Sequence, residues 1–156
     1  TLLKTTQSSF ANFVRDRYTA LPESNERLLA TSVDSSWEYL PGATENCGDF
    51  EAVTSRIRKE MVKAFSGPVQ TGVPSASLQE TAFQMGKAVI NQVSEVGSIT
   101  LYLPNIHNIP VDMAPFRLEN KDYTGNPDVF WVTKEPFGII QATVSRSGSQ
   151  NLKSRL

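Results

Sequence analysis

Apolar and polar residues alternate from Arg27 to Tyr39, which predicts a long β-strand with one half-buried face. The face expected to be buried carries Leu29, Thr31, Val33, Ser35, Trp37 and Tyr39, whereas Asp34, Ser36 and Glu38 face the other way. The sequence also favours strand over residues 2–6, 98–103 and 106–111, with an interruption at Pro104. Residues 128–133 and 139–145 are expected to form a closing hairpin.

Helical spacing replaces this alternation in the middle of the chain. One helix is expected after the capping residue Asp49 and before the stop signal Gly67-Pro68. A second helix is expected to open with the capping box formed by Ser77 and Glu80. The two expected apolar stripes are Phe50, Val53, Ile57, Met61 and Ala64, and Leu78, Ala82, Met85, Val89 and Val93.

The predicted order is therefore β-β-α-α-β-β. Consecutive strands joined by short connections favour an α+β fold, with a four-stranded antiparallel sheet and two helices on one face. We expect one folded domain over residues 1–146 and a tail over residues 147–156. Because the chain opens at Thr1 directly in a strand-like stretch, we also expect it to be a fragment or one product of a cleaved chain.

Composition and charge argue against several classes of protein. The 156 residues contain 15 Lys and Arg against 16 Asp and Glu, so the near-neutral balance argues against a nucleic-acid-binding surface. The single Cys, Cys47, excludes an internal disulfide, and with only one His the sequence predicts no metal site. No apolar run approaches the length of a membrane span, so no membrane partner is expected.

The start of the second expected helix is a candidate binding site for an anion. Unpaired backbone N–H groups and the positive end of the helix dipole favour negative charge there. Gln79 lies in that first turn, and its carboxamide can both donate to and accept from the edge of a heterocycle. The alternative is an ordinary capped helix with a solvated Gln79.

Two polar residues of one expected strand form a second candidate. Asn105 and His107 are two positions apart, so they share a face. A His can shuttle a proton near neutral pH, and an Asn can hold water or another small polar ligand. The alternative is a hydrogen-bonded structural His at a strand end.

Arg27 and Phe10 are candidates for recognising a flat, charged ligand. The guanidinium fork of Arg27 suits a planar oxyanion or a carbonyl-and-nitrogen edge, and Phe10 could provide a stacking surface. Each also fits a simpler role, Arg27 on the surface and Phe10 in the core. The final residues Ser154, Arg155 and Leu156 form a variant of the Ser-Lys-Leu peroxisomal address, so we expect a peroxisomal protein.

Nearly the whole chain resembles the C-terminal half of urate oxidase, also called uricase. The blocks that carry the resemblance are Leu3-Lys4-Thr5-Thr6-Gln7-Ser8, Phe13-Val14-Arg15-Asp16 with Tyr18-Thr19, Leu29-Ala30-Thr31 with Val33, Leu103-Pro104-Asn105-Ile106-His107, and the Ser-Arg-Leu tail. The resemblance implies a tunnelling fold, in which a homotetramer of two-halved subunits closes the sheets into a barrel. It also implies a cofactor-independent, metal-free enzyme of purine degradation that oxidises urate with dioxygen to 5-hydroxyisourate and hydrogen peroxide.

The resemblance assigns roles to individual residues. Phe10 matches the aromatic residue that stacks on urate, and Arg27 matches the Arg that binds one edge of the purine. At the opposite edge stand Gln79 and the backbone N–H of Leu78. The remaining matches are Asn105 for holding dioxygen or water, His107 for the proton relay, and Ile140 for an apolar wall.

The resemblance also implies that the site needs more than this chain. In the family, the N-terminal half of an adjoining subunit supplies the relay Lys and Thr, so this chain alone should not hold a complete site. Two alternatives remain at this point. One is an enzyme of the same fold that acts on pterins, and the other is a non-catalytic purine- or pterin-binding half.

Overall fold

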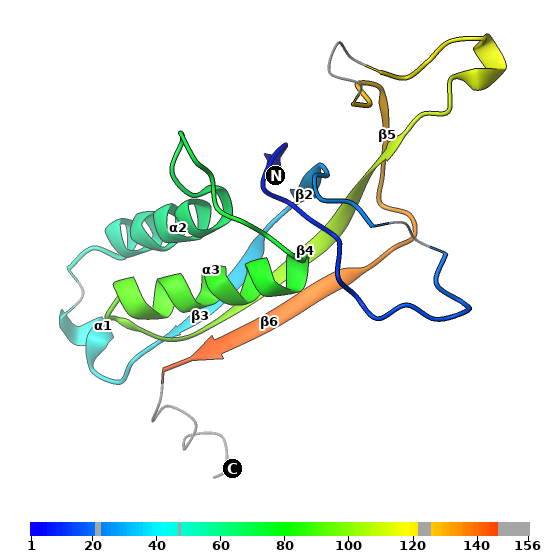
Figure 1. Cartoon of the computed structure of the whole chain (residues 1–156). Helices are drawn as coiled ribbons and strands as arrows, with labels where there is room; N and C mark the ends of the chain where they lie inside the picture. The colour runs from blue at the N-terminus through cyan, green and yellow to red at the C-terminus, as the bar shows by residue number, and fades with distance from the viewer. Residues whose placement is uncertain (21–22, 47, 122–125, 147–156) are drawn as a thin grey trace.

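A single antiparallel sheet with two long helices on one face makes up the structure, a computed structural model that describes residues 1–20, 23–46, 48–121 and 126–146 (Figure 1). The strands are β1 (Leu2–Lys4), β2 (Leu29–Thr31), β3 (Asp34–Tyr39), β4 (Val96–Pro110), β5 (Phe130–Thr133) and β6 (Ile139–Ser145). The α+β class predicted from the sequence is confirmed, but the described sheet has six strands where four were expected, because β1 and the separately paired β5 and β6 all join it. The expected tail at 147–156, with its targeting tripeptide, lies outside the described residues.

β4 is the central strand of the sheet and fixes the register of its neighbours. β2 and β3 pair with it in one continuous register, with Thr31 opposite Asn105 and Asp34 opposite Tyr102. The predicted strand over 27–39 is thus correctly located but broken in two. At the break, the hydroxyl of Thr31 donates to the carbonyl oxygens of Ser32 and Pro104, so a side chain replaces part of the backbone ladder.

Pro104 does not interrupt β4, contrary to the prediction. The strand continues through it from Val96 to Pro110. The register that sets Thr31 opposite Asn105 places Pro104 opposite Ser32, in the break between β2 and β3. The N–H that proline lacks is therefore missing at a position where no continuous ladder requires it.

The expected hairpin over 128–133 and 139–145 is also wrong, although both segments are strands. β6 pairs with residues 98–104 of β4 and β5 pairs with residues 107–110, so each pairs with β4 instead of with the other. A strand as long as β4 offers ladder partners to both. The segment between β5 and β6 is held to β4 by a hydrogen bond of 2.9 Å, which the N–H of Asn105 donates to the carbonyl of Gly138.

The two long helices begin and end where the sequence predicted. In α2 (Phe50–Ser66), Asp49 accepts from the N–H groups of Glu51 and Ala52, and α3 (Leu78–Gln92) is capped by Ser77. Gly67 ends α2 with a φ of 69°, and an added Cβ would lie 2.5 Å from the backbone of Gly72. Two short helical turns, α1 (Ala43–Asn46) and η1 (Ala114–Phe116), complete the described elements.

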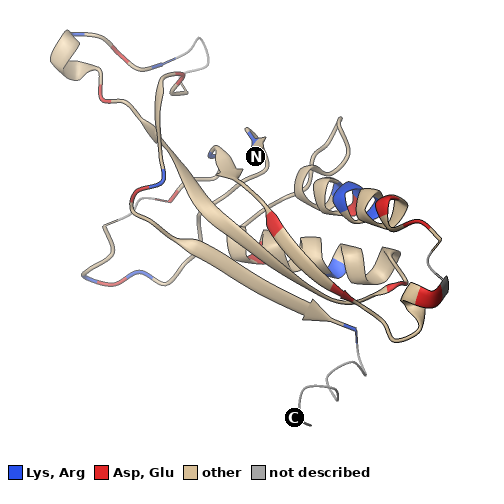
Figure 2. Cartoon of the chain, turned by 180° about the vertical axis from the view of Figure 1, so that it is seen from behind, with Lys and Arg blue, Asp and Glu red and all other residues tan. Residues whose placement is uncertain are grey.

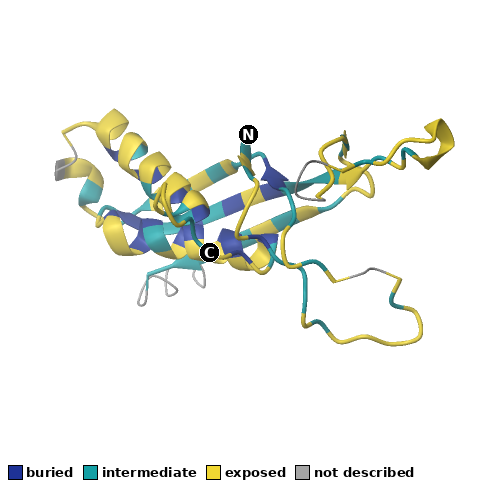
Figure 3. Ribbon diagram, turned by 45° about the horizontal axis from the view of Figure 1, so that its top comes forward, coloured by how far each residue is buried: buried dark blue, intermediate teal, exposed yellow. Residues whose placement is uncertain are grey.

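The core lies between the helices and one face of the sheet, where the buried residues gather (Figure 3). α3 packs closely on the sheet, because a Cβ at Gly86 would come within 2.7 Å of Val144 on β6. The buried stripe of α2 lies nearer the helix end than predicted: Phe65 is buried, whereas Phe50 is 49% exposed and makes an edge-to-face contact with Tyr39. Figure 2 shows the opposite face of the sheet, which carries no helix. No helix in the described ranges is long and apolar enough to cross a membrane.

Candidate active site

The structure brings Phe10 and Arg27 into contact. Phe10 is held by an antiparallel bridge to Ser24, with N···O distances of 2.7 and 2.9 Å. The N–H of Arg27 donates to the carbonyl of Ser8 at 2.9 Å, and its guanidinium carbon lies 5.2 Å from the centroid of the Phe10 ring. The Phe13 ring also stacks on Phe10, with centroids 4.5 Å apart. An aromatic ring and a guanidinium fork therefore occupy one small region, as recognition of a flat anion requires.

The guanidinium of Arg27 is incompletely satisfied. Its Nε is buried and has no hydrogen-bond partner among the described residues. Burial also lowers the pKa of Arg27 from its ordinary value, because the charged form loses solvation. A buried donor on a charged group is costly to leave unpaired. The geometry therefore fits a position that a ligand acceptor completes.

The start of α3 presents unpaired backbone donors, as the sequence predicted. Ser77 Oγ accepts from the N–H of Glu80 at 3.0 Å, while the Glu80 carboxylate accepts from Ala76 at 3.3 Å instead of from the capping residue itself. The N–H groups of Leu78 and Gln79 find no partner within the described part of the chain. The Leu78 side chain is buried, but Gln79 is exposed and its carboxamide makes no hydrogen bond to a described residue.

Ser75 connects the Phe10 segment to the start of α3. Its N–H donates to the carbonyl of Gln7 at 2.7 Å, and its carbonyl accepts from the N–H of Ser9 at 3.1 Å. Ser75 stands two residues before the cap of α3, and Ser9 directly precedes Phe10. This short parallel bridge sets the Phe10–Arg27 pair on a segment next to the start of α3. No hydrogen bond or ring contact joins Gln79 to Phe10 or Arg27 across the residues that the structure describes.

Asn105 and His107 both lie on β4 and are partly buried. Strand alternation places them on one face, as predicted, and this is the face on which Leu103 packs under the helices. His107 Nε2 lies 3.0 Å from the carbonyl oxygen of Pro136. That contact requires a proton on Nε2, so Nδ1 is the ring atom left to accept one. The contact also satisfies the simpler prediction of a hydrogen-bonded structural His.

Ile140 lies directly opposite Leu103 on β6 and packs against the core. Residues opposite one another on paired strands share a face, so Ile140 lies on the same face of the sheet as Asn105. No local pattern singled out Ile140, and only the family resemblance did so. Sequence reasoning missed the buried polar residues Ser8, Ser75 and Thr81, which no motif marks.

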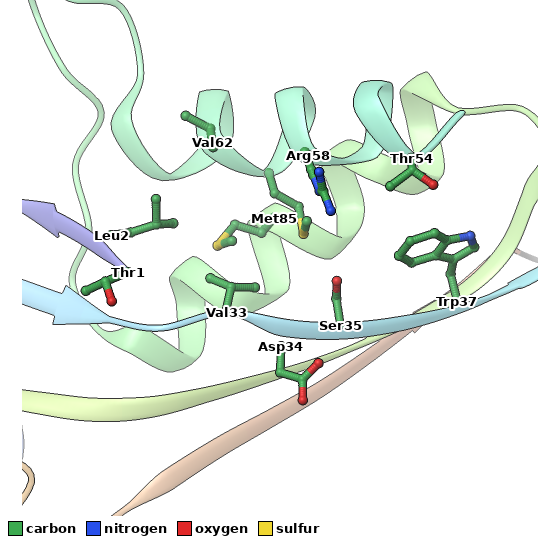
Figure 4. Close-up of a pocket in the computed structure, with 11 residues that line it drawn as sticks. Thr1, Leu2, Val33, Asp34, Ser35, Trp37, Thr54, Arg58, Val62 and Met85 are labelled. Atoms are coloured by element: carbon green, nitrogen blue, oxygen red, sulfur yellow. The ribbon is translucent and has the colours of Figure 1, made fainter. Parts of the chain in front are cut away.

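The one pocket described, of about 430 Å³, lies elsewhere, between α2 and β3 (Figure 4). Trp37 of β3 and Val33, directly before β3, line it together with Arg58 and Met61 of α2. None of the predicted site residues lines this pocket. The predicted site residues lie in four segments: the Phe10–Arg27 region, the start of α3, the far half of β4 and the start of β6. Within the described ranges, a direct contact joins Phe10 to Arg27, and none joins Asn105 or His107 to either of them. Across the described ranges, no cluster of three His, Cys, Asp or Glu residues could hold a metal ion.

The curled antiparallel sheet with two helices on one face is an architecture found in solved uricases. The chain overlays a crystal structure of uricase from Arthrobacter globiformis with a TM-score of 0.79 and 38% identity, covering 96% of this chain and 47% of that one. The uricase family model matches residues 1–141, and the chain belongs to the uricase family.

Curated relatives support this membership. The chain is 43% identical to a uricase of Arabidopsis thaliana, covering 96% of this chain and 49% of that protein. It is 39% identical to the uricase of Arthrobacter globiformis, covering 96% and 45%, respectively. A urate oxidase from Bacillus sp. TB-90 shares the fold at a TM-score of 0.69 with 21% identity. The chain thus spans about half the length of the curated relatives it matches.

Proposed function

We propose that the chain is the C-terminal half of a urate oxidase subunit. With the N-terminal half, in a homotetramer, it oxidises urate with dioxygen and water to 5-hydroxyisourate and hydrogen peroxide. The observation that carries the proposal is the Phe10–Arg27 pair, with its buried and unpartnered Nε, on a segment bridged to the start of α3. Membership of the uricase family supports urate as the flat anion.

In this proposal, urate is held between two sources of positive potential. The purine ring stacks on Phe10, the guanidinium of Arg27 binds one edge, and the opposite edge meets the Leu78 N–H and the Gln79 carboxamide. Urate is a monoanion at neutral pH. Arg27 and the dipole of α3 favour that charge and lower the cost of a second deprotonation.

The electron-rich purine is then the reductant of dioxygen, so the proposal requires no metal or organic cofactor. Asn105 holds dioxygen or water above the ring, and Ile140 supplies an apolar wall. His107, through Nδ1, joins a proton relay with a Lys and a Thr that the N-terminal half of an adjoining subunit contributes. Orientation of the reactants and removal of a proton are the protein's contributions to the rate.

Urate consumption by the assembled protein tests this function. The chain is mixed with the N-terminal half of a uricase, and loss of urate absorbance is followed together with peroxide release. We expect one peroxide for each urate consumed. An oligomer that binds urate without consuming it would instead support the non-catalytic purine-binding alternative, and an oligomer that binds only pterins would support the other.

Replacing Asn105 with alanine should separate binding from chemistry. If Asn105 positions dioxygen, turnover should fall by about tenfold to a hundredfold, because one positioned hydrogen bond near the reacting centre is lost. Urate affinity should stay within about twofold of the unsubstituted enzyme, since Asn105 does not hold the purine edge in this proposal. Steady-state kinetics and equilibrium urate binding measure the two quantities. Loss of urate binding with an unchanged maximal rate would contradict the role given to Asn105.

The proposed location is the peroxisome. We expect that deleting Leu156 leaves the folded domain and its activity intact but abolishes import, because the address is read by a receptor at the chain terminus. The measurement is microscopy of a fluorescent fusion that keeps the C-terminus free, in cells without another uricase. Import of the deleted chain under these conditions would refute the targeting role.

A further inference from the structure

A small polar cluster, with two buried hydroxyl residues and a half-buried lysine, lies beneath the start of α3. It consists of Lys4 on β1, Ser75 in the loop before α3 and Thr81 on α3 itself. Ser75 and Thr81 are 4% and 3% exposed. Lys4 Nζ donates to Ser75 Oγ at 2.8 Å, to the carbonyl of Val73 at 2.6 Å and to that of Phe65 at 3.3 Å. The ammonium thus ties β1 to the end of α2 and to the loop that leads into α3.

The hydroxyl groups extend this cluster to the cap of α3. Ser75 Oγ and Thr81 Oγ1 are 2.9 Å apart, and Thr81 Oγ1 lies 2.8 Å from the carbonyl of Ser77. Lys4 has only donors, and each hydroxyl has a single proton. Ser75 Oγ therefore accepts from both Lys4 and the Thr81 hydroxyl, and the single Thr81 proton is shared between Ser75 Oγ and the carbonyl of Ser77. The chain of hydrogen bonds ends one residue before Leu78.

The backbone of Ser75 is hydrogen-bonded to the segment that carries Phe10. Its N–H and carbonyl are bonded to Gln7 and Ser9, on either side of the fully buried Ser8. The carbonyl of Ser8 in turn accepts from Arg27. One residue is thus joined through its side chain to α3 and through its backbone to the Phe10–Arg27 segment.

Placing a charged lysine at this partly buried position costs solvation free energy. Loss of solvation lowers the pKa of Lys4 from its ordinary value, so the fold disfavours the charged form that the three acceptors require. An apolar side chain would fill the space without that cost. The three hydrogen bonds of the ammonium offset that cost and hold β1 to the end of α2 and to the loop before α3.

We propose that Lys4 is a positioning residue for the purine: through Ser75 and Thr81 it fixes the start of α3, with Leu78 and Gln79, relative to Phe10 and Arg27. The inference rests on the proposed function, because the spacing it fixes is that between the two edges of bound urate. Lys4 itself does not touch the purine.

Kinetics of the assembled enzyme test the positioning role. We expect Lys4→Met to raise the urate KM about tenfold while kcat stays within about twofold, because the two binding edges lose their fixed spacing. Thr81→Val, which removes the hydroxyl and keeps the shape, should also raise KM, whereas Thr81→Ser should restore it. The matched control is Lys121→Met, since Lys121 makes an exposed ion pair with Glu119. An unchanged KM in both Lys4→Met and Thr81→Val would overturn the proposal.

Amide hydrogen exchange provides a readout that does not depend on catalysis. In the 156-residue chain, Lys4→Met and Thr81→Val should each speed exchange both at Ser9–Phe10 and at Glu80, whose N–H groups are hydrogen-bonded, and Lys121→Met should change neither. Faster exchange confined to β1, or uniform throughout the chain, would show a merely structural lysine and overturn the proposal. If the assembled enzyme consumes no urate, the proposed function fails, while the exchange pattern still decides whether Lys4 couples the two segments.

Discussion

Replacing Arg27 with lysine should weaken urate binding to the assembled enzyme by about 1–3 kcal/mol, a loss of about fivefold to 150-fold in affinity. Lysine keeps the charge but cannot make the paired hydrogen bonds of the guanidinium fork. The buried Nε that lacks a partner would have no counterpart, and a single ammonium would replace the guanidinium whose carbon lies 5.2 Å from the Phe10 ring centroid. Equilibrium urate binding under anaerobic conditions measures the effect without turnover.

Arg58→Lys is the matched control for this substitution. Arg58 lines the separate pocket between α2 and β3, so the same chemical change should leave urate affinity unaltered there. Gln79→Ala tests the opposite edge of the purine and should also weaken binding. Urate affinity that is unchanged in both Arg27→Lys and Gln79→Ala would refute the two-edge site.

The chain alone should oxidise no urate. The proposed relay Lys and Thr enter from another half, so His107 would have no relay to complete. The isolated chain should also self-associate, because the outer edges of β3 and of β6 have no strand partner among the described residues. Apolar side chains are also exposed on β5 and in the segment between β5 and β6, including Trp131 at 65% and Phe137 at 63%.

Sedimentation and a urate assay on the same preparation check this prediction. We expect polydisperse, inactive chain that becomes a defined, active oligomer when the N-terminal half is added. The matched sample is the N-terminal half alone, which should be inactive as well. A monodisperse and fully active preparation of residues 1–156 would contradict the requirement for a second half.

The helices could be predicted from the sequence because their signals are local. Asp49 and Ser77 cap through residues two or three positions away, and Gly67 ends α2 through its own backbone conformation. The strand errors have a different origin. The break after Thr31, the continuation through Pro104 and the separation of β5 from β6 all depend on the register of β4, which joins residues far apart in the chain.

The same difference between local and long-range signals applies to the candidate site. Phe10, Arg27, Gln79, Asn105 and His107 could be proposed from their own chemistry, but their grouping could not. The contact between Phe10 and Arg27 depends on two strand-like bridges. Lys4 escaped notice as a functional residue because its three acceptors lie 61 to 71 positions away in the sequence. Buried long-range hydrogen bonds of this kind leave no periodic pattern.

The most direct test of the account is a structure of the assembled enzyme with urate, determined without dioxygen so that the substrate is not consumed. We expect the purine to lie on the Phe10 ring, with one edge bonded to Arg27 and the other to the Leu78 N–H and the Gln79 carboxamide. Urate bound away from Phe10, for instance between Trp37 and Arg58 in the pocket beside α2, would contradict the proposed site.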